Sequence, residues 1–118
     1  MTPRDLIVQQ PATPSQLVLL FHGVGSSARD LMPLGEAMAP HLPAAAIVSL
    51  QAPEAAGPGR QWFSIQGVTE TDRPARVAAA MPGFRQAVGQ WQAACAIGSA
   101  GTTLIGFSQG AIMGLEST

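Results

Sequence analysis

Residues 17–21, Leu-Val-Leu-Leu-Phe, form an uninterrupted apolar run. A strand with one solvated face alternates apolar and polar side chains, whereas a run without alternation is typical of a strand that is covered on both faces. Residues 44–50 form a second apolar run and residues 102–105 a third, shorter one. These segments predict buried strands of a largely parallel sheet. Residues 5–8, bounded by later prolines, predict an outer strand.

Helical patterns lie between these strands. Leu31, Leu34 and Met38 fall at steps of three and four, which predicts a helix over residues 28–39 with Ser27 as its N-cap. Residues 109–115 predict the start of another helix, directly after the third strand.

The longest helix is predicted between residues 72 and 98 by a stripe of apolar side chains at helical spacing. The stripe consists of Val77, Met81, Phe84, Val88, Trp91 and Cys95. Asp72 is the expected N-cap, and Pro82 predicts a kink or a break because its ring clashes with the preceding turn. Cys95 fits this stripe as a small buried hydrophobic residue.

The element order is strand, helix, strand, long loop over residues 51–73, helix, strand, helix. Strands that alternate with helices predict an α/β fold, with a mostly parallel sheet and helices on both faces. With 118 residues the chain is expected to form one domain.

The composition excludes several classes of function. A net charge of −1 provides no electrostatic footprint for nucleic acid, and no cluster of residues has the spacing of a metal site. The longest apolar runs are too short for a signal peptide or a membrane span, and one cysteine cannot form an internal disulfide. We therefore expect a cytoplasmic protein without a cofactor or metal, whose partner is a small molecule; the oligomeric state stays open.

The motif with the clearest chemistry is Gly106-Phe107-Ser108-Gln109-Gly110. A serine on a tight strand-to-helix turn has a strained backbone and an exposed hydroxyl, and glycines two residues before and after it avoid side-chain clashes. The flanking segments have the strand and helix character that such a turn requires. The alternative interpretation is a glycine-rich turn with a solvated serine.

A second glycine loop, His22-Gly23-Val24-Gly25, follows the first apolar run. In hydrolases with a serine elbow, such a loop supplies a backbone N–H to the oxyanion hole, and glycine lets the main chain approach a ligand. His22 is either a general base or a loop residue whose ring hydrogen-bonds locally. We favour the second interpretation, because the catalytic histidine of such hydrolases follows the serine in the chain. His41 is expected on a surface loop.

Trp62 and Phe63 lie in the long loop and have two interpretations. They either pack beneath the loop as part of the core, or they form a wall of an acyl or alcohol pocket.

With these motifs in place, the chain resembles the phospholipase/carboxylesterase family of α/β-hydrolases, which includes the acyl-protein thioesterases. The resemblance rests on three stretches across the chain, which are residues 19–25, 59–64 and 104–111. The Gly-Phe-Ser-Gln-Gly-Ala form is far more specific than the bare motif, and Gln-Trp-Phe suggests the bacterial esterase branch.

The resemblance implies an α/β-hydrolase fold and a serine carboxylesterase that forms an acyl-enzyme. Ser108 would be the nucleophile, and the backbone N–H groups of Val24 and Gln109 would form the oxyanion hole. The implied substrate-binding residues are Gly23, Trp62 and Phe63. Many members carry Asp where this chain has Ser26, which puts the loop-stabilising role of that carboxylate in doubt.

The expected acid and histidine of the triad would follow Ser108, and residues 109–118 contain Glu116 but no histidine. Residues 1–118 are therefore expected to be the N-terminal portion of a single α/β-hydrolase domain, without the part that carries these two groups. Alone, they are expected to be inactive and marginally folded, because an apolar strand edge would be bare.

Three alternatives to a carboxylesterase remain open at this point. The same chemistry could act on a thioester or a lysophospholipid, as in acyl-protein thioesterases and lysophospholipases. The chain could be a non-catalytic fragment that acts only when the missing segment completes it. A nucleotide-binding module fits poorly, because the glycine loop lacks the third glycine of a dinucleotide fingerprint and the lysine of a phosphate loop.

Overall fold

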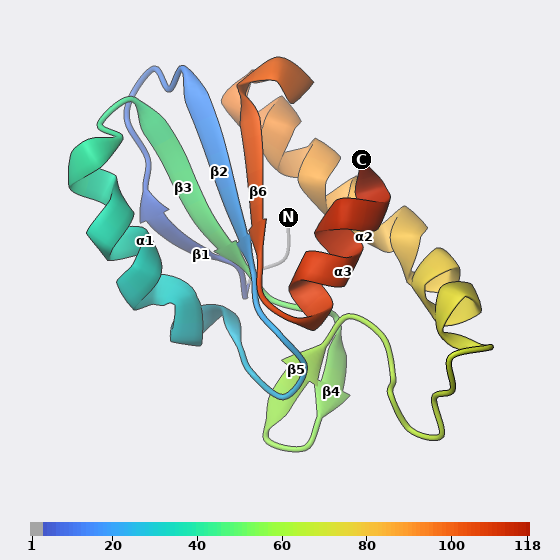
Figure 1. Ribbon diagram of the computed structural model, residues 1–118. Coiled ribbons are helices and arrows are strands. Elements are labelled where there is room, and N and C mark those ends of the chain that lie inside the picture. Colours follow the sequence, from blue (N-terminus) through green and yellow to red (C-terminus); the bar gives the residue numbers. More distant parts are fainter. Residues whose placement is uncertain (1–3) are drawn as a thin grey trace.

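The computed structural model describes residues 4–118, and its centre is a four-stranded sheet in the order β1-β3-β2-β6 (Figure 1). Strand β2 is parallel to both β3 and β6, whereas β1 is antiparallel to β3. The strands are β1 (Leu6–Gln9), β2 (Gln16–Phe21), β3 (Ala45–Leu50) and β6 (Thr102–Gly106). The sheet is therefore mostly parallel, as predicted, with the outer strand at one edge.

The two central strands are buried on both faces, which explains why their sequences show no alternation. Every residue of β3 is buried, as are all residues of β2 after Gln16. Leu17, Leu19 and Phe21 face one layer of helices, while Val18 and Leu20 face the other. The continuous apolar runs were therefore interpreted correctly.

Helices cover both faces of the sheet (Figure 1). The long helix α2 (Arg73–Cys95) and α3 (Gln109–Ser117) lie on the face that contains Leu17 and Phe21. Helix α1 (Met32–Met38) covers the opposite face, with the 3₁₀ turns Ala28–Leu31 and Ala39–His41 at its two ends. The pair of helices and the single helix therefore sandwich the sheet.

The first predicted helix is shorter than expected. Residues 28–39 form a 3₁₀ turn followed by α1, and Pro33 occupies the first turn of α1, where a missing N–H is tolerated. Ser27 has the extended backbone of an N-cap but makes no capping hydrogen bond with its side chain.

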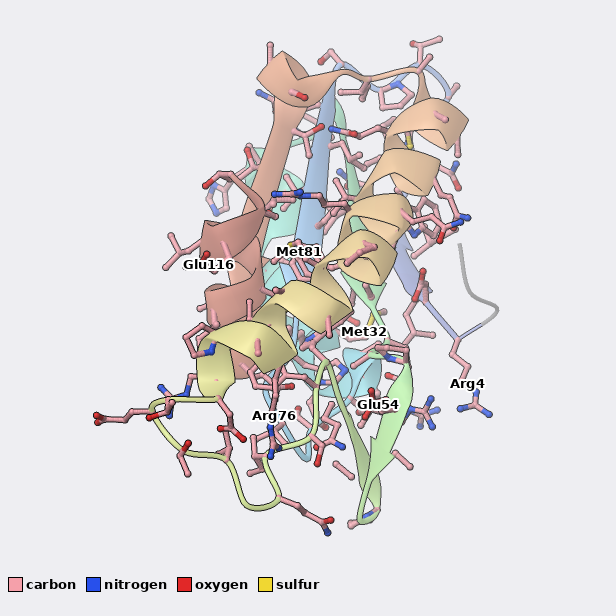
Figure 2. The ribbon with its side chains drawn as sticks, turned by 90° about the vertical axis from the view of Figure 1, so that its right-hand side faces the viewer. Arg4, Met32, Glu54, Arg76, Met81 and Glu116 are labelled. Carbon is pink, nitrogen blue, oxygen red and sulfur yellow. The ribbon has the colours of Figure 1, made fainter. Side chains whose placement is uncertain are left out.

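The sequence predicted a kink or a break at Pro82, and helix α2 runs through Pro82 as one element, so there is no break; a kink stays a prediction. The buried stripe packs against the sheet on both sides of Pro82, and this packing outweighs the loss of one backbone donor (Met81, within the stripe, is labelled in Figure 2). Asp72 sits at the N-cap position, but its carboxylate accepts from the N–H and hydroxyl of Thr69 instead of capping the helix.

The predicted long loop contains a short antiparallel hairpin, β4 (Glu54–Ala56) and β5 (Gly59–Gln61). Gly57 at its turn has φ of +59°, which favours glycine. The hairpin lies at the end of the sheet where β6 leads into α3 (Figure 1). A final 3₁₀ turn, Ser99–Gly101, precedes β6. Among residues 4–118, none of the helices has the length and apolar character needed to cross a bilayer.

Candidate active site

Ser108 stands at the turn between β6 and α3 with φ of 52° and ψ of −114°. Non-glycine residues rarely adopt positive φ, and such strain is kept only where the surroundings enforce it. The N–H of Phe107 donates to the Phe21 carbonyl over 3.0 Å, and the N–H of Gly110 donates to the Phe107 carbonyl over 2.9 Å. These bonds hold the residues on both sides of Ser108, whose side chain is exposed.

The two glycines of the motif are sterically required, as the sequence predicted. A Cβ on Gly106 would collide with the backbone of Gly110 and Ala111. A Cβ on Gly110 would collide with the carbonyl oxygens of Phe21 and His22. Gly106 therefore lets the strand turn tightly into α3, and Gly110 lets the elbow pack against the end of β2.

The loop after β2 lies directly against the elbow. A Cβ on Gly23 would be 3.3 Å from both the Phe107 carbonyl oxygen and Ser108 Cβ. Val24 follows in this loop, and its N–H has no acceptor among the described residues; the same holds for the N–H of Gln109, which opens α3. Two free backbone donors thus flank the region of Ser108.

The hairpin holds this loop from the other side. The Gly25 N–H donates to the Arg60 carbonyl over 2.8 Å, and the Arg60 N–H donates to the Ser26 carbonyl over 2.9 Å. Gly25 has φ of +81°, and a Cβ on Gly59 would collide with the Gly25 carbonyl. Glycine at position 59 lets the two main chains approach this closely, and glycine at position 25 allows the positive φ of the loop.

His22 is fully buried, and both of its ring nitrogens are occupied. Nε2 accepts the Ala52 N–H over 3.0 Å, so Nδ1 carries the proton and donates to the Gly23 carbonyl at 2.7 Å. Burial lowers the pKa of His22, although the hydrogen bond to Gly23 opposes this shift. This geometry agrees with a ring that hydrogen-bonds locally and leaves no nitrogen free to accept a proton from Ser108.

The side chain of Gln109 reaches back from the elbow to the chain that follows β5. Its Oε1 accepts the Trp62 N–H over 2.6 Å and the Phe63 N–H over 3.4 Å, while its Nε2 donates to the Phe63 carbonyl over 2.8 Å. Only 3% of Gln109 is exposed. The sequence motif predicts a role only for the backbone N–H of Gln109, although a polar residue at the start of a buried helix is itself a signal that its amide has partners.

Trp62 and Phe63 are each 4% exposed and belong to the main core. The Trp62 ring contacts Phe21 and Phe84 with centroid distances of 5.5 and 5.4 Å, and its Nε1 donates to the His22 carbonyl over 2.9 Å. Both residues therefore pack beneath the loop as part of the core.

Phe63 also lines a cavity of about 310 Å³ between the hairpin and the start of α2. Glu54 and Arg76, which also line it, are labelled in Figure 2. The pocket-wall role of Phe63 stays a prediction.

Ser26, which stands where many family members carry Asp, contacts a carboxylate of the neighbouring turn. Ser26 Oγ donates to the carboxylate of Asp30 over 2.7 Å, which brings a negative charge to the same loop. The loop therefore keeps a carboxylate contact in another form.

The remaining candidates lie away from the elbow. His41 is exposed on the 3₁₀ turn after α1, and Cys95 is buried in α2, where burial raises the pKa of its thiol. Among residues 4–118 no group of three or more His, Cys, Asp or Glu side chains could hold a metal ion.

Comparisons with known proteins identify the family. The profile of the Phospholipase/Carboxylesterase family matches residues 3–118. The esterase YpfH of Escherichia coli strain K12 is 51% identical over 114 residues, which cover 94% of this chain and 49% of that protein.

Two solved structures share the fold. Esterase PE8 superposes with a TM-score of 0.82 at 34% identity, covering 92% of this chain and 54% of PE8. A carboxylesterase from Mesorhizobium loti has a TM-score of 0.71 at 21% identity, covering 87% of this chain and 47% of its own, and supports the fold alone. The fold is of the α/β-hydrolase type, and the chain spans about half the length of these relatives.

Proposed function

Because this chain belongs to the phospholipase/carboxylesterase family, we propose that it carries the nucleophile half of a serine carboxylesterase, with Ser108 as the nucleophile. The observation that carries the proposal is the juxtaposition at the elbow. An exposed serine with φ of 52° stands beside two backbone N–H groups that have no acceptor among residues 4–118.

The proposed reaction has two stages. Ser108 Oγ attacks the ester carbonyl carbon, and the tetrahedral oxyanion accepts hydrogen bonds from the N–H groups of Val24 and Gln109. Collapse of the intermediate expels the alcohol and leaves an acyl group on Ser108. Water then attacks this acyl-enzyme, which releases the carboxylic acid and restores the hydroxyl. The N-terminus of α3 adds a partial positive charge near the oxyanion.

Ser108 needs a base to take its proton, and no residue from 109 to 118 is a histidine. His22 is already bonded at both nitrogens. The proposal therefore places the triad acid and histidine outside these 118 residues, and residues 1–118 alone are expected to have no esterase activity.

The chemistry of the elbow does not separate esters from thioesters or lysophospholipids, since the same acyl-enzyme forms from each. Gly23, which packs on Ser108, and Phe63, which lines the cavity beside α2, are the proposed substrate-facing positions. Trp62 would then support the groove from within the core.

A fusion protein tests the proposal. Residues 1–118 are joined to the part of the E. coli esterase YpfH beyond the matched region, and hydrolysis of p-nitrophenyl esters of increasing chain length is measured beside a thioester and a lysophospholipid. We expect ester hydrolysis by the fusion, and a loss of at least about 1,000-fold in Ser108→Ala. Ser117→Ala is the control on the same helix and should keep full activity. Equal activity in Ser108→Ala would refute the proposal.

A further inference from the structure

The chain from Ala52 to Phe63, called the hairpin segment below, touches both parts of the proposed oxyanion hole. Arg60 pairs with Gly25 and Ser26 through its backbone, which fixes the loop on one side of Val24. The Ala52 N–H binds the ring of His22, on the other side of Val24. The loop that carries one oxyanion donor is thus held by the hairpin segment at both ends.

The second donor is the N–H of Gln109, and the side chain of the same residue grips the hairpin segment. Its amide bonds to both the N–H and the carbonyl of Phe63 and to the N–H of Trp62. Trp62 in turn donates through its indole N–H to the His22 carbonyl. A side-chain hydrogen-bond path from one donor to the other therefore runs through the buried amide of Gln109, in addition to the backbone bond from Phe107 to Phe21.

We propose that the side chain of Gln109 is a positioning residue, which sets the distance between the two oxyanion donors by anchoring the elbow to the hairpin segment. The inference rests on the proposed function, because only an oxyanion needs both N–H groups at one point. Electrostatic stabilisation of this kind depends on donors that are already in place before the reaction begins.

The amide of Gln109 suits this role better than a hydrophobic side chain of the same size. It is 3% exposed and forms hydrogen bonds with three backbone groups. A hydrophobic side chain could not form these bonds, and the three groups would need other partners. Removing the amide leaves one carbonyl and two N–H groups of Trp62 and Phe63 without the partner that they have in the structure, and these groups would move to find new ones. The movement would displace the hairpin segment, and with it the loop of Val24.

The first test needs no catalytic activity. Gln109→Met keeps the length of the side chain and the backbone N–H but removes the three hydrogen bonds. Hydrogen–deuterium exchange followed by mass spectrometry, on residues 1–118 and on the fusion with the YpfH segment, should show exchange at least about tenfold faster in peptides covering residues 62–63 and 23–26. The prediction concerns residues 23–26 above all, because the side chain of Gln109 makes its hydrogen bonds to Trp62 and Phe63 and none to these residues.

Gln92→Met is the matched control. Gln92 also joins two elements through its amide, which donates to Thr102 Oγ over 3.0 Å, but this bond lies between α2 and the start of β6. The control should leave exchange in residues 23–26 unchanged. If Gln109→Met also leaves it within about twofold of the wild type, or if Gln92→Met raises it equally, the positioning role is refuted.

A second variant keeps the test valid if Gln109→Met folds poorly. In Gln109→Glu, one carboxylate oxygen can still accept from Trp62, but the other faces the Phe63 carbonyl and repels it. Burial raises the pKa of the introduced carboxyl, and its protonated form has an O–H that can donate to that carbonyl. The deficit in melting temperature relative to the wild type should therefore shrink as the pH is lowered from about 8 to about 5.

The wild type is melted in parallel, because the ring centroid of His22 lies 5.7 Å from that of Trp62 and burial lowers the pKa of His22, so His22 also makes stability depend on pH. Gln109→Met carries no titrating group, so its deficit should not change with pH. A deficit in Gln109→Glu that is equally independent of pH would overturn the hydrogen-bond argument.

Kinetics of the fusion separate this inference from the proposed function. Gln109→Met should lower kcat by about 10- to 100-fold and change KM by less than about threefold, since the donors act on the transition state. A wild-type fusion that hydrolyses no ester refutes the proposed function, while the exchange test still decides the positioning role. An active fusion whose kcat is unaffected by Gln109→Met refutes the positioning role alone.

Discussion

Strands β2 and β6 are neighbours in one sheet but have different environments. Strand β2 pairs with β3 on one side and β6 on the other, and it is buried from Leu17 to Phe21. Strand β6 pairs only with β2 among the described strands, and none of its residues is buried. Helix α3 shows the same gradient, because Gln109 and Gly110 are buried whereas Leu115 is 76% exposed.

The difference shows where the elbow obtains its geometry. The contacts that hold the elbow come from the end of β2, the loop after it and the hairpin segment, and they include the buried residues Phe21, His22 and Trp62. The open edge of β6 contributes none of the contacts described above. We therefore expect substitutions on the buried side to alter stability and the proposed active site strongly, and substitutions on the open side to alter them weakly.

Two glycines on α3 give the sharpest test of this comparison. Gly110→Ala should destabilise the fold by about 3 kcal/mol or more, because its Cβ would collide with the backbone of Phe21 and His22. Gly114→Ala, one turn later, meets nothing within 4 Å and should stabilise α3 by up to about 1 kcal/mol. Urea unfolding followed by circular dichroism measures both. Equal effects would show that the two ends of α3 do not differ.

The two tryptophans extend the comparison to hydrogen bonds. Trp62→Phe should cost about 2 kcal/mol, because the buried His22 carbonyl loses its indole partner. Trp91→Phe removes a bond to Asp5 over 2.9 Å, where the carboxylate lies nearer the surface and water can replace the donor. Its cost should be smaller, as measured by the midpoint of urea unfolding. A larger loss in Trp91→Phe would contradict this account of the hairpin segment.

The sequence predicted the sheet and the elbow well because both depend on local patterns. Unbroken apolar runs are specific to strands buried on two faces, and the glycines beside Ser108 follow from the sterics of one turn. The hairpin over residues 54–61 could not be predicted in the same way, since its strands have three residues each and are stabilised by contacts with the distant loop at Gly25. The side-chain role of Gln109 depends on that hairpin and was missed with it.

The extent of helix α2 was predicted, but a break at Pro82 could not be excluded from the sequence. The clash of Pro82 is a local effect, whereas the packing of the stripe from Val77 to Cys95 against the sheet is a tertiary one. The sequence reveals the clash of Pro82, but it does not reveal how strongly the helix packs against the sheet.

A smaller effect on stability should come from His22, at the buried end of β2, when the pH is changed. Burial lowers the pKa of His22 in the folded state. Its contribution to stability is therefore fully present above the unfolded value of about 6.5 and is lost as the pH falls through the folded value. Thermal melts between about pH 8 and 5 should show this loss in the wild type and also in the control His41→Gln, whose residue is exposed. If His41→Gln removed the pH dependence, the dependence would come from His41 and the attribution to His22 would be wrong.

The smallest effect is expected at the open edge. Leu115→Gln should change the free energy of unfolding by less than about 0.5 kcal/mol, because the side chain makes little contact within the described residues. Thermal melting of the two proteins checks this. A loss of about 2 kcal/mol would show that Leu115 is held by contacts other than those among residues 4–118.

The most direct measurement concerns the hydroxyl of Ser108. The fusion of residues 1–118 with the C-terminal part of the E. coli esterase YpfH is treated with a fluorophosphonate, digested and mapped by mass spectrometry. The account predicts a single adduct on the peptide that contains Ser108, with no adduct in Ser108→Ala. Ser26, Ser49, Ser64 and Ser117 serve as internal controls and should stay unmodified. Labelling at one of these serines, or an unlabelled Ser108 in a fusion that hydrolyses esters, would contradict it.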